Sequence, residues 1–194
     1  VESLLDYELV GELALTGELR PISGLLPTAI QAMQAKRVLI VPKERAEEIS
    51  FLEYPNFYVA ENLRDVVEAL EGEKRLAPPD KIDTLERQEF RDFSEVKGQH
   101  FAKRALEIAA AGGHNVLLIG PPGTGKTMLA SRFAGIMPSM NQKEAIESAM
   151  IASISRQGFH ASQFGVRPYR TPHHTASSVA LVGGGSYPKP GEIS

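Results

Sequence analysis

The sequence predicts an α/β protein of two domains. Short apolar runs that fit buried strands alternate with stretches of helical periodicity between residues 8 and 70. Further along, a glycine-rich phosphate-loop pattern lies between an apolar run and a helical stretch. The 194 residues are enough for one or two domains, and a hydrophobic content of 42% allows a packed core.

The elements of the first domain follow from local patterns. Residues 8–22 fit a hairpin, because Leu9, Gly11, Leu13 and Leu15 alternate with other residues before the turn at Thr16-Gly17 and residues 19–22 return after it. Asn62 is suited to cap a helix whose apolar residues share one face. The elements expected after the hairpin are a helix over 23–36, a strand over 37–41, a short helix over 44–49, a strand over 57–59 and the capped helix over 63–70.

Composition divides the chain into three parts. We expect a first domain over residues 1–72, a charged linker with Pro78-Pro79 over 73–92, and a second domain over 93–194. Residues 1–92 hold 11 Lys+Arg against 19 Asp+Glu, a net charge of −8, whereas residues 93–194 hold 10 against 5, a net of +5. A basic second half suits a polyanionic partner as well as a nucleotide, although charge alone does not indicate nucleic acid.

The second domain begins with a predicted helix over 99–111, with Ala105, Ile108 and Ala109 on its inner face. A five-residue apolar run predicts a buried strand immediately before the phosphate loop. The elements expected from there are the strand over 115–119, a helix over 128–134, and a helix over 142–154 that Asn141 caps. Residues 155–194 are rich in Gly, Pro, His, Ser and Arg and have weak periodicity.

Residues 120–127 read Gly-Pro-Pro-Gly-Thr-Gly-Lys-Thr, a phosphate loop in its strand-to-helix context. Backbone N–H groups and the helix N-terminus favour phosphate oxygens, so a nucleoside triphosphate with Mg²⁺ is the predicted ligand. Lys126 is expected to reach the outer phosphates and Thr127 to bind the metal ion, as the two catalytic residues. A ligand-free Gly/Pro turn is the alternative, which the context disfavours. The predicted binding residues are Gly120, Pro121, Pro122, Gly123, Thr124, Gly125, Lys126, Thr127 and Met128.

Several classes are disfavoured by what the sequence lacks. There is no cysteine for a disulfide or thiolate metal site, no secretory signal pattern, and no apolar run long enough to span a bilayer, so we expect a cytoplasmic protein. Asp92 is the last aspartate, and the acids after Lys126 are Glu144, Glu147 and Glu192, none of which ends an apolar strand. We therefore expect the chain to stop before the acidic strand that holds Mg²⁺, and to bind nucleotide without useful hydrolysis.

Four longer strings resemble the magnesium-chelatase-like branch of the AAA+ ATPases, especially its competence-associated bacterial members. They are residues 93–99, 103–115, 167–177 and 180–194. The resemblance implies the front half of an AAA+ α/β/α sandwich in 93–194. It further implies ATP and Mg²⁺ as cofactors, branched or single-stranded DNA as partner, a homo-hexameric ring, and hydrolysis coupled to DNA branch migration or helicase action in natural transformation and recombination.

The first domain resembles the C-terminal part of a Lon-protease-like domain, of the ribosomal S5 domain 2-like class. Residues 11–13, 17–22 and 38–42 carry this resemblance. Thr28 occupies the place of the catalytic lysine of Lon proteases, so the resemblance does not imply a Ser–Lys dyad.

The same family resemblance suggests further site residues. Val96, Gly98 and Gln99 are expected to line an adenine pocket; a helix cap and entry turn is the alternative. Tyr187 and Lys189 are candidates for contacts with nucleic acid, by base stacking and phosphate pairing. Arg167 and Arg170 lie in one basic, proline-punctuated run and are candidates for phosphate contact, either to nucleic acid or to the nucleotide of a neighbouring subunit. A hydrogen-bonded turn and a loose tail are the alternatives there. The adjacent His173 and His174 lack the spacing of metal ligands on a helix face.

Other functions stay open at this point. The chain fits the motor of a metal chelatase, which the Lon-like first domain disfavours, or a protein-remodelling ATPase that acts through a protein partner. A protease is disfavoured by Thr28, and a nucleoside kinase by the length of chain before the loop. A nucleotide-dependent assembly module without hydrolysis is compatible with the residues present.

Overall fold

A computed structural model of the chain describes residues 4–81, 90–155, 158–184 and 188–193. The chain divides into two compact units. The first unit holds residues 1–86, 146–164 and 170–194, and the second holds 87–145 and 165–169. These units group residues that pack together in space. The predicted domain boundaries at residues 72 and 92 stay a prediction. Among the described residues, no helix is long and apolar enough to cross a membrane.

The first unit is built on a parallel three-stranded sheet, which confirms the predicted α/β class. The strands β1 (Tyr7–Leu9), β4 (Val38–Pro42) and β5 (Phe57–Ala60) lie in the order β1-β4-β5. The central strand β4 is apolar and largely buried, as a parallel strand covered on both faces requires. The predicted hairpin is also present, as β2 (Glu12–Leu13) paired antiparallel with β3 (Leu19–Arg20).

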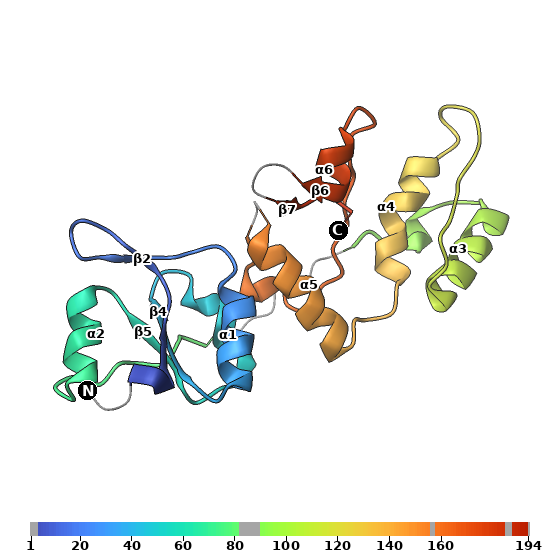
Figure 1. Cartoon of the computed structure of the whole chain (residues 1–194). Coiled ribbons are helices and arrows are strands. Elements are labelled where there is room, and N and C mark those ends of the chain that lie inside the picture. Colours follow the sequence, from blue (N-terminus) through green and yellow to red (C-terminus); the bar gives the residue numbers. More distant parts are fainter. Residues whose placement is uncertain (1–3, 82–89, 156–157, 185–187, 194) are drawn as a thin grey trace. The chain divides into compact units, whose positions relative to one another are not determined.

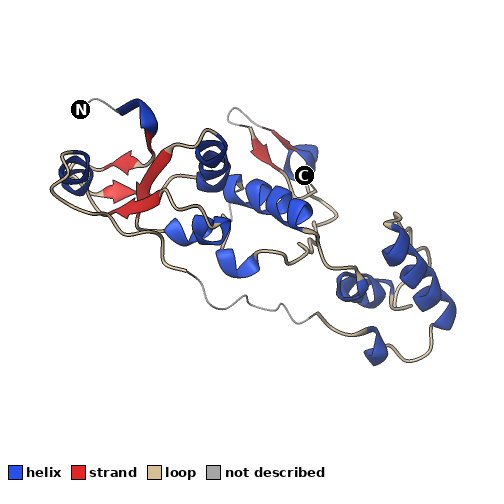
Figure 2. Ribbon diagram, turned by 90° about the horizontal axis from the view of Figure 1, so that it is seen from below, coloured by secondary structure: helices blue, strands red, loops and turns tan. Residues whose placement is uncertain are grey.

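Alternation along β4 assigns the helices to opposite faces of the sheet (Figure 2). Leu39 and Val41 pack in one cluster with α1 (Leu25–Gln34), and Ile40 packs in another with Val66 of α2 (Leu63–Leu70). The predicted cap of α2 is confirmed, since Asn62 Oδ1 accepts a hydrogen bond from Asp65 N at 2.9 Å. The short helix predicted over 44–49 is a 3₁₀ helix, η2 (Ala46–Leu52).

The larger cluster of the first unit includes residues from far along the chain (Figure 1). Ala149 of α5 (Gln142–Ile154) packs against it, together with Phe159 and Ala161. Phe51 stacks on Phe164 with ring centroids 4.1 Å apart. The C-terminal half of α5 and the segment after it therefore complete a core that α1 and the sheet begin.

The second unit has a small core of its own. The buried members of this cluster are Phe93, Val96, Leu106 and Leu129, supplied by η3 (Phe93–Glu95), the turn after it, α3 (His100–Gly112) and α4 (Lys126–Ile136). The predicted inner face of α3 is wrong in part. Leu106, Ala109 and Ala110 are buried, whereas Ile108 is 53% exposed and Ala105 is exposed too.

The strand predicted over residues 115–119 is not formed. Leu117 and Ile119 are 82% and 86% exposed, and only Leu118 of this run packs against the core of the second unit. A strand needs a neighbour to accept and donate its backbone hydrogen bonds, and none of the described strands pairs with this segment. The strand predicted from the apolar run alone is therefore wrong for the part of the chain that the structure describes.

The linker and the last segment also contain local structure. Val59 N donates to Ala77 O at 2.9 Å, so part of the predicted linker pairs with the edge strand β5. Near the C-terminus, α6 (Ser178–Val182) leads into β6 (Gly183–Gly184), which pairs antiparallel with β7 (Lys189–Pro190). Gly191 is needed there, because a Cβ atom at this position would clash with the backbone oxygen of Leu181.

Candidate nucleotide site

The phosphate loop turns into helix α4 through two glycines with left-handed backbone. Gly123 has φ 79° and Gly125, the N-cap residue of α4, has φ 84°. A side chain at either position would be strained, which explains why this turn contains glycines. The unbonded N–H groups of the first turn and the helix dipole both favour an anion at this end of α4.

Lys126 is the first residue of α4, and its amine lies on the loop itself. Nζ donates to Gly120 O at 2.8 Å and to Pro121 O at 2.7 Å. Thr124 Oγ1 also donates to Pro121 O, at 2.9 Å. Hydrogen bonds from Lys126 and Thr124 to loop carbonyl groups therefore stabilise the loop, and the charged lysine amine lies against these carbonyl oxygens. The side chain of Thr127 is exposed, and that of Met128 is 38% exposed.

Of the three residues expected in an adenine pocket, the structure brings Gln99 to the phosphate loop. Its Nε2 donates to Thr124 O at 3.1 Å. Val96 lies in the core, 1% exposed, and its carbonyl accepts a hydrogen bond from Lys103 Nζ. Gly98 and Gln99 both have left-handed backbone, with φ of 69° and 54°. Their contact with adenine stays a prediction.

An ion pair that the sequence did not suggest joins this turn to α4. Arg132 is 7% exposed, and its Nη2 lies 2.6 Å from Glu95 Oε2. Arg132 Nη1 donates to Met128 O at 3.1 Å, while its buried Nε has no hydrogen-bond partner among the described residues. The two residues are 37 positions apart, so no local pattern in one sequence relates them.

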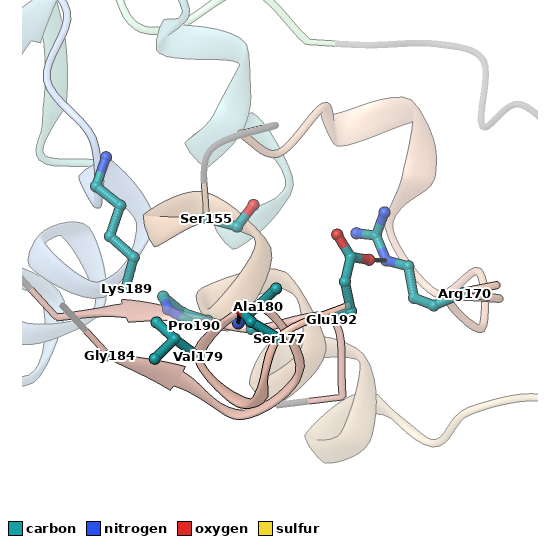
Figure 3. Close-up of a pocket in the computed structure, with 10 residues that line it drawn as sticks. Ser155, Arg170, Ser177, Val179, Ala180, Gly184, Lys189, Pro190 and Glu192 are labelled. Carbon is teal, nitrogen blue, oxygen red and sulfur yellow. Dashed lines mark hydrogen bonds and ion pairs between the residues drawn. The ribbon is translucent and has the colours of Figure 1, made fainter. Parts of the chain in front are cut away.

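Two of the four candidate nucleic-acid residues lie around one pocket. Arg170 and Lys189 line a cavity of about 430 Å³ in the first unit. Figure 3 shows Arg170 facing Glu192 at one end, with Nε and Oε2 3.9 Å apart, and Lys189 at the other. Arg167 belongs to the second unit, where it contacts Pro138 O and Glu144. Tyr187 lies outside the described residues.

The adjacent His173 and His174 contact each other and a neighbouring threonine. The rings of His173 and His174 are 4.3 Å apart, and His173 Nδ1 lies 2.7 Å from Thr175 Oγ1. Across the part of the chain that the structure describes, no group of three His, Cys, Asp or Glu residues could hold a metal ion.

Comparison with known proteins decides the family. The model of magnesium chelatase subunit ChlI matches residues 92–194, and a second model, subunit ChlI of Mg-chelatase, matches residues 1–45. The chain belongs to this ChlI family. The predicted resemblance to the magnesium-chelatase-like branch is thereby confirmed.

Similar proteins match almost the whole chain. YifB of Escherichia coli is 49% identical over 97% of the chain, and competence protein ComM of Haemophilus influenzae is 47% identical over 98%. The chain spans only 37% and 38% of the lengths of these two proteins. A Lon protease of Archaeoglobus fulgidus is 33% identical over 93 residues, which are 47% of this chain and 13% of that protein. The predicted Lon-like similarity is therefore present.

Proposed function

We propose that this chain is the nucleotide-binding portion of a ring-forming ATPase of the AAA+ class. The observation that carries the proposal is the loop before α4, where two left-handed glycines lead into a helix that begins with Lys126. ATP would lie with its phosphates on the loop N–H groups from Gly123 to Thr127. The Lys126 amine would exchange the carbonyl groups of Gly120 and Pro121 for the β- and γ-phosphates.

The residues at this end of α4 also fit Mg²⁺. Thr127 presents an exposed hydroxyl in the first turn of the helix, next to the lysine. An oxygen ligand beside phosphate oxygens is the environment that Mg²⁺ prefers. When bound, the ion would neutralise phosphate charge, and Thr127 would be its ligand from this chain.

We expect this chain to bind nucleotide but not to hydrolyse it at a useful rate. The acids after the phosphate loop are Glu144, Glu147 and Glu192. Glu144 accepts from Asn141 N at the start of α5 and pairs with Arg167, and Glu192 faces Arg170. Hydrolysis by the chain that disappears in Lys126→Ala would contradict this expectation.

For the whole protein, we propose ATP hydrolysis coupled to movement of branched or single-stranded DNA, by a homo-hexamer. The similarity to the competence protein ComM supports this, as do Arg170 and Lys189 beside one cavity. The alternative is a chelatase-type or protein-remodelling motor, which the ChlI family model favours. A protease has less support, because the Thr28 hydroxyl, in the place of a catalytic lysine, donates to Gly24 O.

ATP hydrolysis by the full-length protein separates these functions. It would be measured without DNA, with linear DNA and with a four-way junction, for the natural sequence and for Lys126→Ala. Stimulation by the junction that is lost in Lys126→Ala would support the DNA motor. Hydrolysis that depends on Lys126 but is indifferent to every DNA would favour the motor that acts through a protein partner.

A further inference from the structure

We propose that Gln99 is a positioning residue for the nucleotide phosphates, and that the Glu95–Arg132 ion pair holds the turn containing Gln99 against the phosphate-loop helix. This inference rests on the proposed nucleotide site. It gives Gln99 a role different from the adenine contact that the sequence suggests. The side-chain amide acts on the loop, through the Thr124 carbonyl.

The hydrogen bond from Gln99 sets the orientation of one peptide group in the loop. Nε2 of Gln99 lies 3.1 Å from Thr124 O. Because the peptide bond is planar and trans, the Thr124 carbonyl and the Gly125 N–H point in opposite directions. The bond therefore fixes the direction of the Gly125 N–H. The bond also keeps the Thr124 carbonyl oxygen pointing toward Gln99. If this oxygen turned into the loop, it would repel a phosphate.

The backbone conformation of Gln99 also supports a specific role for its hydrogen bond to Thr124. Its φ of 54° and ψ of 32° lie in the left-handed region, which a residue with a side chain seldom adopts. Gln99 O also accepts the first hydrogen bond of α3, from Lys103 N at 2.9 Å. A strained conformation of this kind persists only where the surrounding contacts impose it.

The Glu95–Arg132 pair connects the start of the same turn to α4. Arg132 Nη2 lies 2.6 Å from Glu95 Oε2, and Nη1 is tied to Met128 O of the helix. Between the two anchors, Val96 is buried in the core and its carbonyl is held by Lys103. The contacts thus form a closed path from α4 through Glu95 to Gln99, and back to α4 through the loop.

Burying the charge of Arg132 costs free energy, and its Nε has no hydrogen-bond partner among the described residues, so stability alone does not account for the pair. An apolar side chain at position 132 would fill the same space without a charge. The pair instead fixes how the turn sits on the helix that carries Lys126. Holding a loop in its binding conformation before the ligand arrives raises affinity by lowering the ordering cost.

Two substitutions at Gln99 test the positioning role. Gln99→Asn tolerates the left-handed backbone but is one methylene shorter, and Gln99→Met keeps the length but has no donor. Gln142→Asn, at an exposed glutamine that begins α5, is the matched control. We expect the Kd for ATP, from calorimetric titration, to rise about five- to tenfold in both Gln99 variants, the equivalent of one hydrogen bond. The ratio of ATP to GTP affinity should not change.

The outcomes separate this inference from the proposed site. If ATP binding depends on Lys126 but both Gln99 variants bind as tightly as the natural sequence, the positioning role is wrong. If the ratio of ATP to GTP affinity falls sharply in the Gln99 variants, Gln99 contacts the nucleotide base, and the positioning role is wrong as well. If Lys126→Ala and the natural sequence bind ATP equally weakly, the nucleotide site itself fails, and the inference fails with it.

A measurement without nucleotide tests the ion pair. The ¹³C chemical shift of the Thr124 carbonyl reports its hydrogen bond, so we expect it to move in Gln99→Asn. We expect it to move in the same direction in Glu95→Gln, although Gln99 is then intact. A Thr124 shift that responds to Gln99→Asn but not to Glu95→Gln would show that the ion pair does not hold the turn.

Discussion

Glu48 shows how a single buried carboxylate can make stability depend on pH. Its residue is 1% exposed, it pairs with Arg45, and its Oε2 accepts a hydrogen bond from Ser153 Oγ at 3.1 Å. Burial raises the pKa of Glu48 above its ordinary value, while Arg45, Ser153 and His160 act in the opposite direction. The folded state therefore holds this proton to higher pH than the unfolded chain does.

The sign of the pH dependence follows. Between the ordinary glutamate pKa of about 4.3 and the raised value, the folded state binds more protons than the unfolded state, so the free energy of unfolding falls as pH rises. We predict that Glu48→Gln removes this fall, whereas Glu44→Gln at an exposed site nearby does not. Urea unfolding at a series of pH values measures it. If Glu48→Gln leaves the dependence of the free energy of unfolding on pH unchanged, Glu48 is not the group that causes it.

At the level of elements, the adjacent Leu117 and Leu118 make a matched pair. Leu117 is 82% exposed, whereas Leu118 packs against the core of the second unit. We predict that Leu118→Ala lowers the free energy of unfolding of this chain by about 1–2 kcal/mol, and that Leu117→Ala changes it by less than about 0.5 kcal/mol. Chemical denaturation of the two variants checks this. Equal losses would mean that residues 115–119 form the strand that the sequence predicted.

Elements whose stabilising contacts are local could be predicted from the sequence. Asn62 and Asn141 cap α2 and α5 as expected, because a cap involves residues only three positions apart. The strand over 115–119 and the inner face of α3 could not, because both depend on which distant residues cover them. Leu106 faces inward because it packs in a cluster with Phe93, Val96 and Leu129, which the sequence of α3 alone does not show.

The site shows the same limit. The phosphate-loop pattern could be recognised from the sequence, since its glycines, lysine and threonine lie within residues 120–127, and its binding of nucleotide stays a prediction. The contacts of Gln99 with Thr124 and of Glu95 with Arg132 join residues 25 and 37 positions apart, and no period in the sequence relates them. The pocket beside Arg170 and Lys189 likewise depends on the pairing of β6 with β7.

On the scale of the whole molecule, charge is distributed unevenly along the chain, with a net of −8 before residue 93 and +5 from there on. If the full-length protein binds DNA, its affinity should fall with salt, because each neutralised phosphate releases counterions. We predict that Arg170→Gln and Lys189→Gln each lower the slope of log K against log salt by about 1. Arg64→Gln, an 86% exposed side chain in α2, is the control and should leave the slope unchanged.

Fluorescence anisotropy at several salt concentrations measures these slopes. If the slope of log K against log salt is unchanged in both Arg170→Gln and Lys189→Gln, these two residues do not contact DNA phosphates. The alternative motor, acting through a protein partner, would then gain support.

Titration of this chain with ATP and Mg²⁺ in a calorimeter tests the central claim most directly. With the natural sequence we predict saturable binding at one site that requires the metal ion. Lys126→Ala should weaken it at least about tenfold, while the melting temperature stays the same, because the Lys126 amine contacts only loop atoms among the described residues. Binding of equal strength in both proteins, or none in either, would contradict the assignment of this loop as a nucleotide site.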